Sequence, residues 1–179
     1  MKKVMRLTIL VICLLALPAM VYGQGKTALS GGLELSLPMG DFGDLVNTGF
    51  GLTLGGVYHY QPQMDFMAYL GYISWGTESD NFSFSAIPVQ FGGRYFFMAK
   101  QDGGPYGGAL LGIHMLKSKS DYGINGENSD TETKFSFAPL LGYELNIDEK
   151  MAIDFSARYQ IVSDADYFGI RVGLNYGLK

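Results

Sequence analysis

Two histidines are the side chains of this sequence best suited to acid–base chemistry. In the pattern of lipid A deacylases, a histidine precedes a serine by two residues on the same face of a strand. Neither His59 nor His114 is followed by a serine at this spacing. His114 lies four residues before Ser118, but four residues of extended chain span about 13 Å, which is too far for a hydrogen bond. The sequence therefore predicts no enzyme, and both histidines are expected to be buried in the fold or to lie at its rim.

Motifs that could bind a cofactor or a metal are weak. Gly49-Phe50-Gly51 begins like a dinucleotide fingerprint, but Leu54 stands where the third glycine belongs and no helical pattern follows. The segment from Asp121 to Glu132 holds four acids without the alternating pattern of a calcium-binding loop, so a solvated loop with at most weak divalent binding is expected. We predict no cofactor and no resident metal.

Charged residues on the polar faces of the candidate strands form a balanced set. Three are arginines and three are acids, so their charges sum to zero. A guanidinium offers five donors in a rigid fork that suits carboxylates. The sequence therefore predicts a charge network inside the fold, formed by Glu34, Arg94, Glu144, Asp154, Arg158 and Arg171.

Eight candidate strands must position these residues. After Gln24 the chain alternates apolar with polar or small residues at a period of two, and no helical periodicity is present. The candidate strands are Ala28 to Leu37, Gly49 to Tyr60, Met64 to Gly76, Phe82 to Met98, Pro105 to Lys117, Phe135 to Asn146, Met151 to Ser163 and Tyr167 to Leu178. In the third and fifth of these, apolar residues lie on both faces, so the register stays open.

The connections between these strands alternate in length. Tight turns follow Tyr60, Ala99 and Asn146. The connections between them are longer and span Pro38 to Thr48, Thr77 to Asn81 and Ser118 to Lys134, and the last one, Asp164 to Asp166, is short. Outer-membrane barrels have short periplasmic turns and longer external loops. Both ends of the barrel chain are therefore expected to face the periplasm, and the external loops carry an excess of acids.

The polar faces of the strands decide between a soluble sheet and a membrane barrel. A soluble antiparallel sheet also alternates, but here the polar face is rich in glycine and sparsely charged, as in the crowded interior of a barrel. Aromatic residues gather near strand ends, where they would form two outward girdles; these include Tyr60, Tyr95, Tyr106, Phe50, Trp75 and Phe135. We predict an all-β fold, a closed eight-stranded antiparallel up-and-down transmembrane β-barrel.

The N-terminal residues have the pattern of a secretory signal peptide. Three basic residues precede an apolar run from Leu7 to Leu17, which is shorter than the ~20 residues of a transmembrane helix. Residues 1–23 are expected to be cleaved and residues 24–179 to form the barrel. The mature chain then has no cysteine for a disulfide, and its net charge of about −7 excludes a basic nucleic-acid-binding surface.

Two segments carry a family resemblance. Leu37 to Asp44 (LPMGDFGD), followed by Asn47 to Gly51 (NTGFG), resembles the first external loop and second strand of small outer-membrane β-barrel domain proteins of Bacteroidetes-type bacteria, which are similar in size to OmpA/OmpX-like barrels. Arg171 to Leu178 resembles the terminal signal read by the barrel-assembly machinery, although Leu178 replaces the usual aromatic residue and Lys179 follows. The resemblance implies an outer-membrane location. The implied partners are outer-membrane lipid and lipopolysaccharide, with the assembly machinery and periplasmic chaperones during biogenesis.

The expected function is that of a non-enzymatic integral outer-membrane barrel. It would act in envelope integrity or in surface contact through its external loops. Eight strands leave an interior just filled by side chains, so a pore is not expected. Two alternatives remain: a periplasmic lipocalin-like binder of a hydrophobic ligand, and a lipid-modifying enzyme, because outer-membrane lipid A deacylases and palmitoyltransferases resemble barrels of this size.

Overall fold

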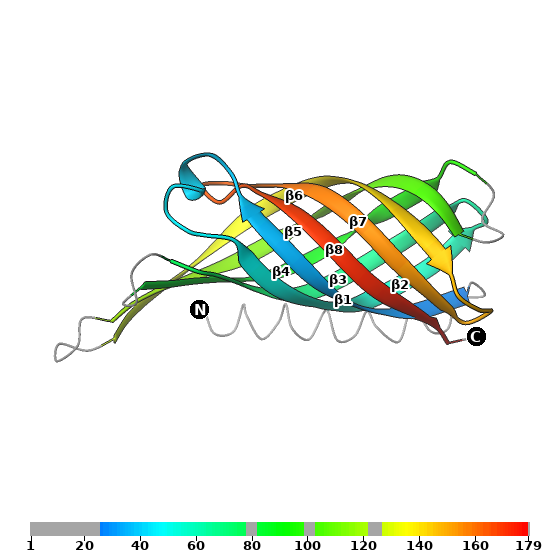
Figure 1. Ribbon diagram of the computed structural model, residues 1–179, viewed down its shortest axis with the longest axis horizontal. Coiled ribbons are helices and arrows are strands. Elements are labelled where there is room, and N and C mark those ends of the chain that lie inside the picture. Colours follow the sequence, from blue (N-terminus) through cyan, green and yellow to red (C-terminus); the bar gives the residue numbers. More distant parts are fainter. Residues whose placement is uncertain (1–25, 78–81, 99–102, 122–126, 179) are drawn as a thin grey trace.

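Eight strands close into an antiparallel barrel in which each strand pairs with the next and the last returns to the first (Figure 1). The computed structural model describes residues 26–77, 82–98, 103–121 and 127–178. The strands are β1 Lys26–Pro38, β2 Gly49–Gln61, β3 Met64–Trp75, β4 Phe82–Phe96, β5 Gly103–Asp121, β6 Glu127–Asn146, β7 Met151–Val162 and β8 Tyr167–Gly177. The predicted fold class is confirmed, whereas the expected signal peptide lies outside the described residues.

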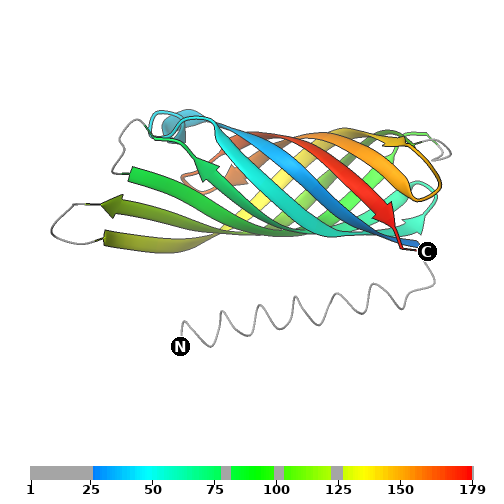
Figure 2. The same ribbon diagram turned by 60° about the horizontal axis from the view of Figure 1, so that its bottom comes forward.

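Strands β5 and β6 extend well beyond their predicted ends. β5 continues to Asp121 and β6 begins at Glu127, so the predicted loop from Ser118 to Lys134 is wrong for most of its length. This part of the hairpin is polar on both faces, and it therefore lacks the apolar alternation on which the prediction depends. In Figures 1 and 2 the two strands project past the rest of the barrel at the end that carries the long loops.

Apolar side chains point outward from the barrel wall. On β8, Ile170, Val172 and Leu174 are exposed, whereas Arg171 and Gly173 between them are buried, as the alternation predicts. Such a wall suits an outside that meets hydrocarbon, and it argues against the lipocalin-like alternative, in which apolar side chains would line the cavity. No helix in the described part of the chain is long and apolar enough to span a membrane.

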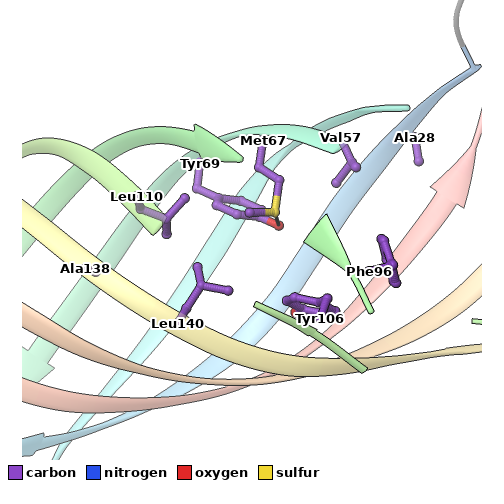
Figure 3. Close-up of a cluster of buried hydrophobic side chains, with 9 residues drawn as sticks. All are labelled: Ala28, Val57, Met67, Tyr69, Phe96, Tyr106, Leu110, Ala138 and Leu140. Atoms are coloured by element: carbon purple, nitrogen blue, oxygen red, sulfur yellow. Dashed lines mark hydrogen bonds between the residues drawn. The ribbon is translucent and has the colours of Figure 1, made fainter. Parts of the chain in front are cut away.

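Two apolar clusters fill parts of the lumen. One extends inward from the short-turn end and includes the rings of Phe96 and Tyr106, 5.3 Å apart (Figure 3). The other lies at the long-loop end and includes Trp75. The prediction that Tyr106 and Trp75 belong to outward girdles is wrong, because both are only 2 % exposed. They lie on β5 and β3, the two strands with apolar residues on both faces.

The first long loop folds into the mouth of the barrel. A short 3-10 turn, η1 (Gly40–Phe42), places Phe42 against Trp75 and Phe84, with ring centroids 5.3 and 5.2 Å away. Backbone hydrogen bonds of 2.9 and 2.7 Å tie this loop to the loops that follow β7 and β3. Phe42 is 4 % exposed, so an apolar cap covers the lumen at the long-loop end.

The closed ladder predicts a shift in gel mobility. Because β1 and β8 are paired with each other, the barrel has no free edge along its wall for detergent to attack. We expect the refolded protein to migrate differently on a denaturing gel before and after boiling. Identical mobility in the two lanes would contradict a closed barrel.

Candidate functional site

Arg94, on the inner face of β4, gathers three carboxylates in the lumen. Its Nε donates to Asp65 Oδ2 at 2.9 Å and its Nη1 to Asp154 Oδ2 at 2.8 Å. Its Nη2 donates to Glu144 Oε2 at 2.5 Å. These four side chains are at most 2 % exposed. Because the carboxylates come from β3, β7 and β6, a single guanidinium links four strands.

Arg171, on β8, continues the network toward the middle of the lumen. Its Nη1 donates to Asp154 Oδ1 at 3.0 Å, so the two oxygens of this carboxylate bind two different arginines. Its Nε donates to Thr53 Oγ1 and its Nη2 to Ser30 Oγ, both at 2.8 Å. The guanidinium of Arg171 therefore has partners on β7, β2 and β1.

Glycines leave the space that Arg171 occupies. A Cβ atom added to Gly32 would lie 2.9 Å from the guanidinium carbon of Arg171, which is closer than van der Waals contact allows. Gly173, opposite Gly32 in the β1–β8 ladder, is similarly close to the same guanidinium. These two glycines thus make room for the guanidinium of Arg171 inside the lumen.

A second ion pair lies closer to the long loops. Arg158, on β7, donates from Nη2 to both carboxylate oxygens of Glu34 on β1, at 2.5 Å to Oε1. Both side chains are almost fully buried. This pair links the two strands that flank β8, and among the described residues neither partner takes part in the ion pairs around Arg94 and Arg171.

The structure places all six predicted network residues in the lumen, in two groups rather than one. The predicted balance of charges has to be corrected, because Asp65 adds a fourth carboxylate to the three guanidiniums. Asp65 lies on β3, whose register the sequence left open. His59 Nδ1 is 2.7 Å from Asp65 Oδ1 at the short-turn end.

Aromatic side chains complete the surroundings of the arginines. Arg94 Cζ lies 4.9 Å from the ring centroid of Phe96 and 4.8 Å from that of Tyr106, and Tyr106 donates its hydroxyl to Asp154 Oδ2 at 2.7 Å. Arg171 Cζ lies 4.9 Å from the ring of Tyr69. Cation–π contacts of this kind gain strength when they are desolvated. Neither tyrosine was predicted to lie here.

Uncharged polar side chains form a separate layer toward the long loops. His114, fully buried, places Nε2 3.0 Å from the Tyr167 hydroxyl, and Gln90 Nε2 donates to Gln160 Oε1 at 2.9 Å. Within the described ranges, no group of three or more His, Cys, Asp or Glu side chains could hold a metal ion. The charged side chains of the lumen thus bind one another.

A hollow of about 930 Å³ reaches the network from the short-turn end. Its lining includes His59, Asp65, Glu144 and Asn175, together with residues of the turn between β6 and β7. Asn175 Nδ2 donates to Glu144 Oε2 at 2.9 Å. The two ends of the lumen therefore differ, with polar groups reachable at one end and an apolar cap at the other.

The match to a known family agrees with this architecture. The family model of the outer membrane protein β-barrel domain matches residues 7–177. The chain belongs to this family. The family implies an outer-membrane location for the barrel. No curated protein matches the chain.

Solved structures resemble this outer membrane β-barrel in fold. Ail, the attachment invasion locus protein of Yersinia pestis, is 21 % identical, with a TM-score of 0.65 over 87 % of this chain and 100 % of that one. OprG of Pseudomonas aeruginosa is 15 % identical, with a TM-score of 0.63 over 86 % and 96 %. Neisserial surface protein A is 14 % identical, with a TM-score of 0.62 over 84 % and 96 %. At these identities the likeness concerns the fold alone.

The buried pair of Arg158 and Glu34 predicts a large effect on stability. Arg158→Ala would leave the Glu34 carboxylate buried without its guanidinium, which typically costs ~3–5 kcal/mol. We expect a strongly lowered urea midpoint for the barrel refolded in detergent micelles. The double variant Glu34→Gln with Arg158→Ala should recover part of the lost stability, because it removes the unpaired charge of the Glu34 carboxylate.

The matched control for this prediction is Lys150→Ala, at an exposed turn position, which should change the midpoint little. If Arg158→Ala and Lys150→Ala lowered the midpoint by similar small amounts, the buried pair would not have the importance that we assign to it.

Proposed function

We propose that this outer membrane β-barrel is a non-enzymatic structural protein that supports envelope integrity and makes surface contacts through its long-loop end. The filled lumen carries this proposal. The ion pair of Arg94 with Asp154 crosses it, the pair of Arg158 with Glu34 lies nearer the long loops, and the cap around Phe42 covers the long-loop end. With the middle of the lumen crossed by side chains and one end capped, partners can reach the outer surfaces and the hollow at the short-turn end.

The surroundings of the two histidines support a role without catalysis. His114 is fully buried and its Nε2 contacts the Tyr167 hydroxyl. His59 contacts Asp65, which also binds Arg94. Each histidine thus has a partner suited to holding it in place. A lipid-modifying enzyme would need a nucleophile beside such a base at a position that lipid can reach.

The orientation that we propose follows the family's architecture, with short turns in the periplasm and long loops outside. The wall then contacts outer-membrane lipid, and the loops lie near the lipopolysaccharide sugars and phosphates. During biogenesis, periplasmic chaperones would carry the chain, and its last strand, Arg171 to Leu178, would dock to the barrel-assembly machinery.

The long-loop end is acidic. Asp41, Asp44 and Asp164 are exposed there. Lys134, in the projecting part of β6, is already engaged: its Nζ lies 3.0 Å from Glu132 and 3.4 Å from Asp164, and these hydrogen bonds raise the pKa of Lys134. We therefore propose cationic partners for this end, or divalent ions shared with lipopolysaccharide phosphates.

A structural neighbour offers a contrast in charge. Ail of Yersinia pestis has been solved with sucrose octasulfate, a heparin analogue. Sucrose octasulfate is a polyanion, and exposed carboxylates repel polyanions. A cationic surface therefore suits the long-loop end of this barrel better than a polyanion does.

The filled lumen predicts an absence of conductance. We expect the purified barrel to produce no steady current steps in planar bilayers, because side chains from several strands cross the lumen and the cap covers one end. Reproducible open steps of nanosiemens size would contradict the structural role proposed here.

The acidic loops predict charge-dependent adhesion. Each exposed charge pair contributes ~0.5 kcal/mol, so we expect the triple variant Asp41→Asn, Asp44→Asn and Asp164→Asn to weaken binding to a polylysine surface roughly tenfold. Asparagine also tolerates the positive φ of 65° at residue 164. Binding would be measured with protein in nanodiscs at low salt.

The control for adhesion is Glu149→Gln, an exposed acid at the opposite end of the barrel. It should leave binding in place if the long-loop end makes the contact. Unchanged binding by the triple variant would remove the proposed cationic contact.

A further inference from the structure

Four buried polar atoms in the long-loop half of the lumen lack a protein hydrogen-bond partner within the described part of the chain. They are His114 Nδ1, Ser136 Oγ, Arg158 Nε and Gln160 Nε2. At most 4 % of any of these residues is exposed. Buried polar groups without partners are rare in folded proteins because their desolvation is not offset. Four of them in one region therefore indicate a ligand.

These atoms belong to side chains on the inner faces of neighbouring strands. In the strand registers, His114 on β5 and Gln160 on β7 are the diagonal neighbours of Ser136 on β6. Gln160 lies opposite Tyr167 on β8, and the Tyr167 hydroxyl is 3.0 Å from His114 Nε2. Arg158 comes two residues before Gln160, on the same face of β7. Side chains of four consecutive strands thus form an arc around this part of the lumen.

Two layers separate these side chains from the ends of the barrel. Toward the long loops, the ring of Tyr167 packs 5.6 Å from that of Trp75, in the apolar cluster that also contains Phe42. Toward the short turns, Asp154 binds both Arg171 and Arg94, and Arg94 reaches it across the lumen from β4. The four atoms therefore lie between an apolar cap and a charged layer, away from bulk solvent.

The chemistry of the four atoms selects the ligand. Arg158 Nε and Gln160 Nε2 can only donate, so the ligand must accept hydrogen bonds, which excludes an ammonium group. The charge of Arg158 is already balanced by Glu34, so a buried anion would add an uncompensated charge. Ser136 Oγ and His114 Nδ1 can donate or accept. A small neutral molecule that both donates and accepts fits all four atoms.

We propose that ordered water molecules bind between these side chains, held by His114, Ser136, Arg158 and Gln160. Buried waters typically make about three hydrogen bonds to groups that otherwise have no partner. The bound water would join the pair of His114 and Tyr167 to the pair of Arg158 and Glu34. The polar layer and the ion pair then form one hydrogen-bonded unit.

The test is water-to-protein magnetisation transfer by NMR on the mature barrel, refolded in detergent micelles. The probe is the Nε–H of Arg158, and the matched control is the Nε–H of Arg171, which is equally buried but donates to Thr53 Oγ1 at 2.8 Å. We expect a cross-peak with the sign of long-lived bound water at Arg158 and none at Arg171. No cross-peak at Arg158, or one with the sign of exchange with bulk water, would overturn the proposal.

A variant and a titration sharpen this test. Ser136→Ala removes only an oxygen without a protein partner, so it should weaken the Arg158 cross-peak at least twofold; an unchanged peak would overturn the role of Ser136. If this variant does not fold, the comparison of Arg158 with Arg171 in the unaltered chain decides. A saturable shift of Arg158 Nε on replacing gluconate with chloride would show an anion site and overturn the proposal.

Discussion

The strongest physical constraint on this structure is the burial of three guanidiniums inside a barrel whose outer wall contacts hydrocarbon. A buried charge is tolerated only when it is paired and hydrogen-bonded, and carboxylates on β1, β3, β6 and β7 meet this demand. Other features of the lumen follow from it. Gly32 and Gly173 leave room for Arg171, and the rings of Phe96 and Tyr106 lie near Arg94. Some of these ion pairs, such as Arg94 with Asp154 and Arg158 with Glu34, in turn join strands that are not neighbours in the ladder.

The sequence predicted the strand count, the topology and the inward face of most strands, because one alternation of apolar and polar residues marks both faces at once. It failed where that alternation is missing. On β3 and β5 both faces are apolar, so Asp65 was overlooked and Tyr106 was placed outside. In the projecting part of β5 and β6 both faces are polar, so strand was taken for loop. Which carboxylate binds which arginine depends on reach across the lumen, and no local pattern encodes it.

The two ends of the barrel are built by different means. At the long-loop end, the loop that carries Phe42 turns inward and packs against Trp75 and Phe84. Asp41, Asp44 and Asp164 remain exposed there. At the short-turn end, the turns are too brief to fold over the mouth, and a hollow reaches the polar groups beneath. At the long-loop end, the loops thus both close the lumen and make the proposed surface contacts, whereas the short turns at the other end do neither.

The ion pairs of the lumen also bear on the order in which the barrel assembles. Arg158 and Glu34 are 124 residues apart in the chain, and Arg171 and Ser30 are 141 residues apart. Neither contact can form until the last two strands reach the first. A sheet that has not yet closed therefore carries Arg158 and Glu34 without each other, and unpaired charges oppose entry into hydrocarbon. Closure of the seam between β1 and β8 and pairing of these two charges thus become a single late event.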